Sequence, residues 1–257
     1  MAEALVDAGA QVAVTGRSRT RAESVASELG QGAGGYELDV RREASVETCL
    51  DQVYEGFGGV DVLINNAGIG MRSVNPSFMS SPQAFWEVSP DGFRDVIETK
   101  MTGVFLAARA IVPRMLGTGG GRVVNVSMNT QTMTRRGFVP YGPAGAGVEA
   151  LSRIMAADLA ETTVTVNILL PGGATATGMI PDDFPAEMRT RLLDPAIMGP
   201  PIVWLASNDA SRSPRPTDRG HRVRGLARQA LDPCTRTTSY ERCPIGGRRE
   251  RAADRRK

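Results

Sequence analysis

Short apolar runs alternate with amphipathic segments along the chain up to about residue 207. Each run is short and continuous, which is typical of strands buried on both faces of a parallel sheet, and we expect strands at 11–16, 34–40, 60–68, 121–127 and 163–171. The segments between them predict helices at 20–29, 44–57, 89–116, 142–160, 182–193 and 201–206. Strands and helices that alternate in this way predict an α/β fold with a doubly wound parallel sheet and right-handed crossovers.

Local signals fix some of the helix ends. Ser89-Pro90-Asp91 provides an N-cap, a proline at the first helical position and an acid in the first turn of one helix. Gly30 ends the helix expected at 20–29. The long helix that starts at Ser89 is expected to contain a kink.

The pattern stops after Ser211. Residues 212–257 hold fourteen Arg or Lys against five Asp or Glu, have few large apolar residues and follow neither helical nor strand periodicity. We therefore expect one domain over 1–211 and a basic, disordered tail over 212–257. A nucleic-acid-binding arm is the alternative, but the tail lacks spaced aromatic residues for base stacking.

A shifted reading frame is the interpretation we favour for this tail. Lysine occurs only at positions 100 and 257, which indicates GC-rich coding DNA, and a frameshift in such DNA produces segments rich in arginine, proline and serine. We expect neither a nucleic-acid nor a membrane partner.

Composition sets further limits. Hydrophobic residues make up 41% of the chain, which is ordinary for a globular protein, and no apolar run approaches the length of a membrane span. The first residues lack a signal-peptide pattern, so a cytoplasmic location is expected. A single histidine, His221, and three cysteines without metal-type spacing predict no metal site.

Four short motifs follow strand ends in a fixed order. They are Asn65-Asn66-Ala67-Gly68, the VVNVS segment 123–127, Tyr141 fourteen residues after Ser127, and Pro171-Gly172. Because ligands of an open parallel sheet bind beyond the carboxyl ends of its strands, these motifs are expected to line one crevice.

On these motifs, residues 4–207 resemble the short-chain dehydrogenase/reductase family. The resemblance implies a Rossmann-like three-layer sandwich that binds NAD or NADP and moves a hydride between the nicotinamide and an alcohol or carbonyl carbon. It also implies a homodimer or homotetramer.

The resemblance also suggests cofactor-binding residues. In the family, an acid at the position of Asp39, next to Val40, holds the adenine edge, and small residues such as Ala67 and Gly68 after Asn66 let the ribose approach. The turn with Pro171, Gly172 and Ala174 meets the nicotinamide amide, and Thr177 contacts the phosphates. Arg17 could bind a ribose 2′-phosphate, which favours NADP over NAD; otherwise Arg17 and Arg19 are solvated loop cations.

The expected catalytic residue is Tyr141. A tyrosine with a pKa near 10 works best as an acid or base when a neighbouring cation lowers that value, and the family supplies a lysine four residues later, where this chain has Gly145. The family's serine position is Met128, so Ser127 or Asn129 would have to hold the substrate oxygen.

A replacement for the missing cation is Lys100, at the family's helix asparagine. We expect it to reach into the space left at Gly145. The alternative, an exposed surface lysine, agrees with how rarely lysine is buried.

Two further departures concern the sheet. The family's first strand and its glycine-rich phosphate turn are not found before the strand at 11–16, and no last strand is recognisable after Trp204-Leu205-Ala206-Ser207. We expect that the natural chain starts ~20 residues upstream, the length of a strand and loop in a dinucleotide-binding unit. The alternative is a real truncation, which would leave a weak sheet with an unpaired, aggregation-prone edge.

The function expected from the sequence is that of an NAD(P)-dependent oxidoreductase. A non-catalytic family member that binds a dinucleotide or a partner, and an inactive remnant, stay open as alternatives. The segments 70–88 and 177–193 should form the substrate pocket, and their large apolar residues form its wall, the core or an oligomer interface: Met71, Phe78, Phe85, Trp86, Met179 and Phe184.

Overall fold

The structure, a computed structural model, describes residues 1–207, residue 210 and the backbone of 222–224. The chain divides into two units, residues 1–227 and 228–257, and every described residue belongs to the first. Up to residue 102 the elements are α1 (Ala2–Asp7), β1 (Val12–Gly16), α2 (Arg19–Leu29), β2 (Ala33–Glu37), α3 (Glu43–Phe57), β3 (Val62–Asn65), η1 (Met71–Ser73), η2 (Phe85–Glu87), α4 (Pro90–Ile97) and η3 (Glu98–Thr102). They are followed by α5 (Gly103–Gly117), β4 (Gly121–Val126), α6 (Thr130–Met133), α7 (Tyr141–Asp158), β5 (Val164–Leu170), α8 (Ala186–Arg189), η4 (Pro195–Met198), α9 (Gly199–Ala206) and β6 (Arg222–Arg224).

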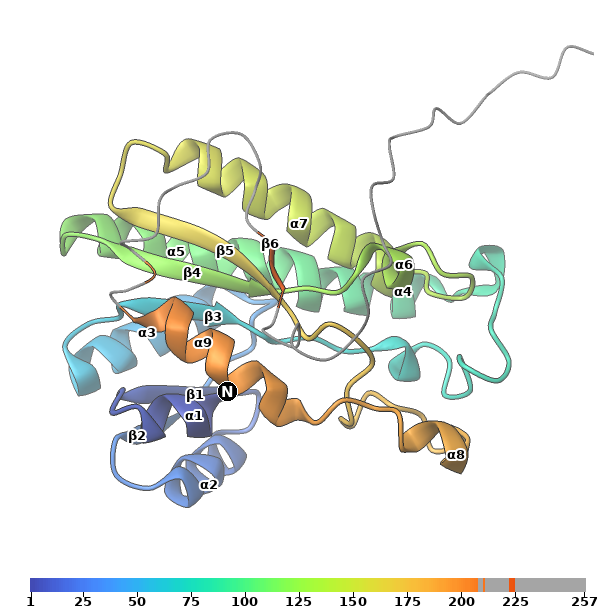
Figure 1. Ribbon diagram of the computed structural model, residues 1–257. Helices are drawn as coiled ribbons and strands as arrows, with labels where there is room; N and C mark the ends of the chain where they lie inside the picture. The colour runs from blue at the N-terminus through green and yellow to red at the C-terminus, as the bar shows by residue number, and fades with distance from the viewer. Residues whose placement is uncertain (208–209, 211–221, 225–257) are drawn as a thin grey trace, which may run out of the picture. The chain divides into compact units, whose positions relative to one another are not determined.

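All pairings between the described strands are parallel. One sheet has the order β3-β4-β5-β6, and β1 pairs with β2 in a second sheet (Figure 1). Asn65 lies opposite Asn125, and Asn125 lies opposite Ile168, so the strand ends are aligned.

Helices cover both faces of the strands. Because side chains alternate along a strand, Val123 and Val124 point to opposite faces. Val124 belongs to a cluster with Leu169 and with residues of α1 and α9, whereas Val123 packs with residues of α3 and α5, including Ile111. This arrangement confirms the predicted α/β fold with three layers.

The strands β1 and β3 each have an edge that pairs with no described strand. The two sheets are therefore separate in their hydrogen bonding, although Val12 and Ile64 pack against the same apolar cluster. The absence of a first strand before β1 stays a prediction.

The expectation that the last strand is lost needs a correction. Residues Arg222–Arg224 form β6, which pairs in parallel with Ile168–Leu170 of β5. Backbone groups make these hydrogen bonds, so an arginine-rich segment without a strand pattern can still pair with an open edge. The disorder predicted for the rest of 212–257 lies outside the described residues.

Two helical expectations also change. The helix expected over 182–193 is reduced to α8, because the backbone on either side makes other hydrogen bonds: Phe184 N donates to Pro181 O in a turn, and Leu193 pairs with the backbone of Ala174 and Ala176. The helix that starts after Ser89 contains the π-helical turn η3, which takes the place of the expected kink. The predicted cap is confirmed, since Ser89 Oγ accepts a hydrogen bond from Gly92 N at 3.1 Å.

None of the helices in the described part of the chain has the length and apolar character needed to cross a membrane.

Gly35 of β2 is the point of closest approach between a strand and α2. A Cβ built at Gly35 would lie 2.3 Å from the backbone nitrogen of Glu23, which cannot move without shifting α2. We expect Gly35→Ala to lower the free energy of unfolding by about 1–3 kcal/mol, as overpacking does. Gly59→Ala is the control, because nothing lies within 4 Å of its Cβ position. Urea unfolding measures both, and equal stability of the two variants would contradict the packing.

Candidate functional site

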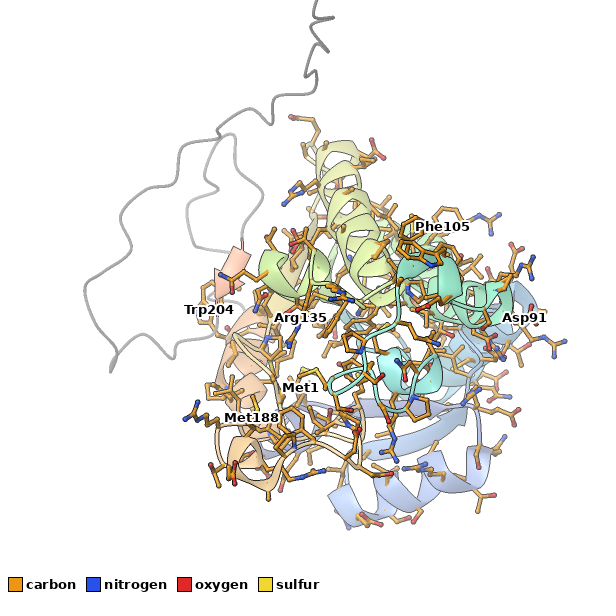
Figure 2. All side chains as sticks on the ribbon, turned by 90° about the vertical axis from the view of Figure 1, so that its right-hand side faces the viewer. Met1, Asp91, Phe105, Arg135, Met188 and Trp204 are labelled. Atoms are coloured by element: carbon orange, nitrogen blue, oxygen red, sulfur yellow. The ribbon has the colours of Figure 1, made fainter. Side chains whose placement is uncertain are left out.

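The residues expected in the site follow the carboxyl ends of parallel strands. In Figure 1 the arrows of β3, β4 and β5 point to the side on which α6 and α8 lie, and Figure 2 shows that side, with Arg135 and Met188 labelled. The residues that follow five successive strand ends are Arg17, Asp39, Asn66, Ser127 and Pro171. Parallel pairing thus brings residues that are far apart in the sequence to one end of the domain.

A buried chain of hydrogen bonds ties these strand ends to α7. Asn65 Nδ2 donates to Asn125 Oδ1 at 2.8 Å, and Asn125 Nδ2 donates to Ser152 Oγ at 2.7 Å. The Ser152 hydroxyl in turn donates to Val148 O at 2.7 Å. Satisfied polar groups of this kind fix one arrangement of a core, so the turn after Asn65 and the helix that begins with Tyr141 are held together.

Tyr141 lies beside the turn that contains Gly68 and Gly70. Its hydroxyl donates to the sulfur of Met179 at 3.8 Å, and a Cβ at Gly70 would lie 3.2 Å from Met179 Cγ, so Met179 contacts both. The Tyr141 ring also packs on the apolar cluster that includes Met71. Burial raises the pKa of Tyr141 above its usual value near 10.

Lys100 is buried, with 8% of its surface exposed. The interpretation of Lys100 as an exposed surface lysine is therefore wrong. Its Nζ lies 5.2 Å from the centroid of the Tyr141 ring, and burial lowers the pKa of Lys100 to about 8. The structure thus brings together the two residues that the sequence linked.

The space beside Gly145 is filled by Met128. A Cβ at Gly145 would lie 2.7 Å from Met128 Cε, and the three nearest heavy atoms all belong to Met128. The expectation that Lys100 occupies this space is corrected: Lys100 lies over the Tyr141 ring instead. The two departures from the family pattern, Met128 and Gly145, therefore pack against each other, and the absence of a side chain at Gly145 makes room for Met128.

The two candidates for holding a substrate oxygen differ in their environment. Asn129 Oδ1 accepts a hydrogen bond from Thr132 N at 2.8 Å and caps α6, which leaves its amide group as a donor. Ser127 Oγ is buried and has no hydrogen-bond partner in the described part of the chain. An unpaired buried hydroxyl is costly, so Ser127 has an unused hydrogen-bonding group, but a substrate oxygen could reach its Oγ only after neighbouring side chains move.

At the position where the resemblance leads us to expect the adenine, Asp39 is held by Arg41. The guanidinium donates from Nε and Nη2 to the two carboxylate oxygens at 2.9 and 2.8 Å, and Arg41 N donates to Oδ1 at 3.1 Å. The Arg41 hydrogen bond lowers the pKa of Asp39 to about 2, and the charge of Arg17 adds to this effect. Arg17 is exposed and lies near Asp39, as the adjacent strands β1 and β2 require.

The other expected cofactor residues are exposed or half-buried, and the half-buried Val40 packs against Gly103. Gly172 has a φ of +89°, a backbone conformation that favours glycine. Thr177 Oγ1 accepts from Met179 N at 3.4 Å. The exposed members of the set are Asn66, Ala67, Gly172, Ala174 and Thr177, with Gly68 and Pro171 half-buried.

Sequence reasoning missed the contacts that join the two pocket segments. Arg72 donates to Gly178 O and Ile180 O at 3.4 and 3.5 Å and pairs with Asp182, and Ser80 Oγ donates to Asp183 Oδ2 at 2.5 Å. No motif or periodicity marks a single arginine in a loop, so the sequence held no signal for these contacts.

The expected wall residues separate into two groups. Met71, Phe78 and Phe184 are buried, whereas Phe85 and Trp86 are 70% and 74% exposed. These last two line a hollow of about 730 Å³ together with Arg135 and Arg136. Tyr141 does not line this hollow, and neither does any residue of the segment 177–193, whereas Met179 contacts the Tyr141 hydroxyl.

Comparison with known proteins agrees with this geometry. The sequence profile of the family described as short chain dehydrogenase matches residues 1–187. A 3-oxoacyl-[acyl-carrier-protein] reductase FabG from Vibrio cholerae is 32% identical over 222 residues, which cover 82% of this chain and 85% of the relative. A relative of the same name from Aquifex aeolicus is 32% identical over 176 residues, 67% of each chain.

Solved structures show the same fold. A 3-ketoacyl-(acyl-carrier-protein) reductase from Brucella melitensis, complexed with NADH, superposes with a TM-score of 0.71 at 28% identity, over 82% of this chain and 86% of the other. A short-chain type dehydrogenase/reductase from Mycobacterium marinum has the same TM-score and identity, over 82% and 84%. The chain belongs to the short chain dehydrogenase family, a family of NAD(P)-dependent oxidoreductases.

Proposed function

We propose that this chain reduces a carbonyl compound, or oxidises the corresponding alcohol, with Tyr141 as the proton donor and acceptor. The observation that carries this proposal is the position of Tyr141. It lies near the Gly68–Gly70 turn, with which it shares the neighbour Met179, and its ring faces the buried cation of Lys100. Burial raises the pKa of Tyr141, and a neighbouring cation acts in the opposite direction because it favours the charged tyrosinate, which suits general acid–base chemistry.

The nicotinamide dinucleotide, when bound, supplies or accepts the hydride. In reduction, the Tyr141 hydroxyl gives its proton to the substrate oxygen, and in oxidation the tyrosinate takes the proton back. The buried, unpaired hydroxyl of Ser127 would hold that oxygen by donating a hydrogen bond, and the amide of Asn129 is the second candidate donor. Met179 must move away from the Tyr141 hydroxyl before a substrate can reach it.

The residues present fit both ends of such a cofactor. Accessible small residues at Ala67 and Gly68 leave room for a ribose, and the turn from Pro171 to Ala174 offers backbone groups to the nicotinamide amide, with Thr177 near the phosphates. Asn66 and Val40 are the further residues proposed to contact the adenine and the ribose of the cofactor. Asp39 already accepts three hydrogen bonds from Arg41, so its role is to hold the loop against which the adenine edge would lie.

The substrate proposed for a first assay is a 3-oxoacyl thioester, because the Vibrio cholerae relative is a 3-oxoacyl-[acyl-carrier-protein] reductase. An apolar cluster with Met71, Phe78 and Phe138 packs against Tyr141, so the ring of Tyr141 has apolar surroundings. The family also favours a homodimer or homotetramer.

A non-catalytic family member is the second candidate. It is favoured by Met179, which covers the Tyr141 hydroxyl, and by Gly145, which provides no cation on α7. Cofactor binding without turnover would select this candidate. An inactive remnant, suggested by the unpaired edges of β1 and β3, would show neither cofactor binding nor cooperative melting.

Cofactor preference depends on Arg17. We expect the fluorescence of NADPH and NADH to increase when either binds, with NADPH bound more tightly, because the exposed guanidinium can pair with the 2′-phosphate. Arg17→Ala should weaken NADPH binding roughly 10-fold, the loss of about one charge-assisted hydrogen bond, and leave NADH binding unchanged. An equal effect on both cofactors would show that Arg17 does not read the phosphate, and Arg21→Ala, on the exposed face of α2, is the matched control.

Removal of the Tyr141 hydroxyl tests the chemistry itself. Tyr141→Phe keeps the ring and its packing on Met71, so NADPH binding should be retained while kcat falls roughly 10²- to 10⁴-fold. Steady-state reduction of a 3-oxoacyl thioester and fluorescence binding measure the two effects. Turnover at the wild-type rate in this variant would refute the assignment.

A further inference from the structure

Lys100 is an unusual residue for its position. It lies on the π-helical turn η3, is 8% exposed and has the Tyr141 ring as its cation–π partner at 5.2 Å. No carboxylate among residues 1–207 forms an ion pair with it. A buried ammonium group without a counter-charge is unfavourable, and a site of this kind is a candidate for function.

The charged groups around Lys100 are engaged elsewhere. The turn η3 packs against α4, α5 and α7. The charged side chains of these helices form other ion pairs: Asp91 with Arg94, Asp95 with Arg41, Arg109 with Glu43, Arg114 with Glu47 and Asp51, and Arg153 with Glu149. On η3 itself, the charge of Glu98 interacts with Arg41 and contributes to the raised pKa of that arginine. On α7, Asp158 stands at the opposite end from Tyr141, about 25 Å away along the helix. Tyr141 is therefore the ionisable group that Lys100 faces.

The helix that carries Tyr141 offers no cation of its own nearby. Gly145, one turn further along α7, has no side chain, and Met128 fills the adjacent space with apolar atoms. The positive charge near the Tyr141 ring thus comes from η3.

We propose that Lys100 is a positioning residue for Tyr141. The ammonium group of Lys100 stabilises the tyrosinate that forms when Tyr141 gives its proton to the substrate. The proton passes from the Tyr141 hydroxyl to the substrate oxygen, and Lys100 stays protonated and forms no covalent bond. This proposal rests on the proposed function, but its electrostatic part can be measured without turnover.

The first experiment compares a permanent cation with a neutral side chain. In the full chain labelled with ¹³Cζ-tyrosine, NMR titration reports the ionisation of Tyr141, which Tyr141→Phe assigns. We expect the pKa of Tyr141 to be about 1 to 3 units lower in Lys100→Arg than in Lys100→Met, the range for an opposite charge within about 4–6 Å of an ionisable group. Arg94→Met removes a positive charge from the neighbouring helix α4 and should leave the value unchanged. Equal values in Lys100→Arg and Lys100→Met would overturn the proposal.

A second measurement applies if Lys100→Arg does not melt cooperatively. Lysine occurs only at positions 100 and 257, so reductive ¹³C-methylation of the wild-type chain gives two lysine side-chain signals. We expect Lys100 to titrate near pH 8, well below Lys257, and part of the Tyr141 signal to follow that titration because the two groups are coupled. A Tyr141 signal that does not respond while Lys100 titrates would overturn the proposal.

Turnover provides the last test. Reduction by the wild-type chain should slow above about pH 8 as Lys100 loses its proton. Lys100→Met should lower kcat roughly 10- to 100-fold at pH 7 without this pH dependence, and Lys100→Arg should retain kcat at pH 9. If the wild-type chain shows no turnover, the proposed function fails and the NMR titrations alone decide the role of Lys100. If Lys100→Met keeps the wild-type rate and pH profile, the function stands and the role of Lys100 is refuted.

Discussion

Parallel pairing in register is the constraint on which the rest of this structure depends. Asn65 lies opposite Asn125 in the sheet, and the amide side chains of these two residues also bond to each other and to Ser152 of α7. The backbone ladder alone would place the ends of β3, β4 and β5 at one edge. The buried amides add a fixed side-chain register, because any slip would leave polar groups unsatisfied in the core. The Gly68 turn and Ser127 follow β3 and β4 at this edge, and Tyr141 begins the helix to which Ser152 belongs.

Much of the fold could be predicted because its signals are local. Continuous apolar runs such as 121–127 and a cap such as Ser89-Pro90 have one common structural meaning, and the corresponding elements form within a few residues of the expected limits. The helix expected over 182–193 is limited to α8, because Leu193 pairs with the backbone of residues 174–176, a contact between separate segments that no local pattern marks. The strand β6 had no signal of its own, since it pairs through its backbone with an edge that lies more than fifty residues earlier in the chain.

The elements that carry the candidate residues were predictable, and the side-chain contacts were not. Motif order predicted that Asn66 and Ser127 follow strands and that Tyr141 lies at the start of a helix, and the bounds of β3, β4 and α7 agree, while the roles of these residues stay predictions. The loop contact from Arg72 to Asp182 joins residues 110 positions apart and leaves no pattern in either segment. The same holds for Met179, which was expected as part of a pocket wall but in fact covers the hydroxyl of Tyr141. Side-chain volume decides such contacts, and volume is matched in three dimensions rather than along the chain.

Three departures from the family pattern, at positions 100, 128 and 145, are physically connected. A methionine at 128 needs the room that a glycine at 145 leaves, since a Cβ there would lie 2.7 Å from Met128 Cε. With that space apolar, a cation for Tyr141 has to come from another element, and η3 places Lys100 over the ring. A cation–π contact of about 0.5 to 2 kcal/mol offsets only part of the cost of burying an ammonium group. The remaining cost of burying the Lys100 ammonium group is reduced when Tyr141 ionises, because the tyrosinate provides the opposite charge. This electrostatic coupling links positions 100, 128 and 145 to the ionisation of Tyr141.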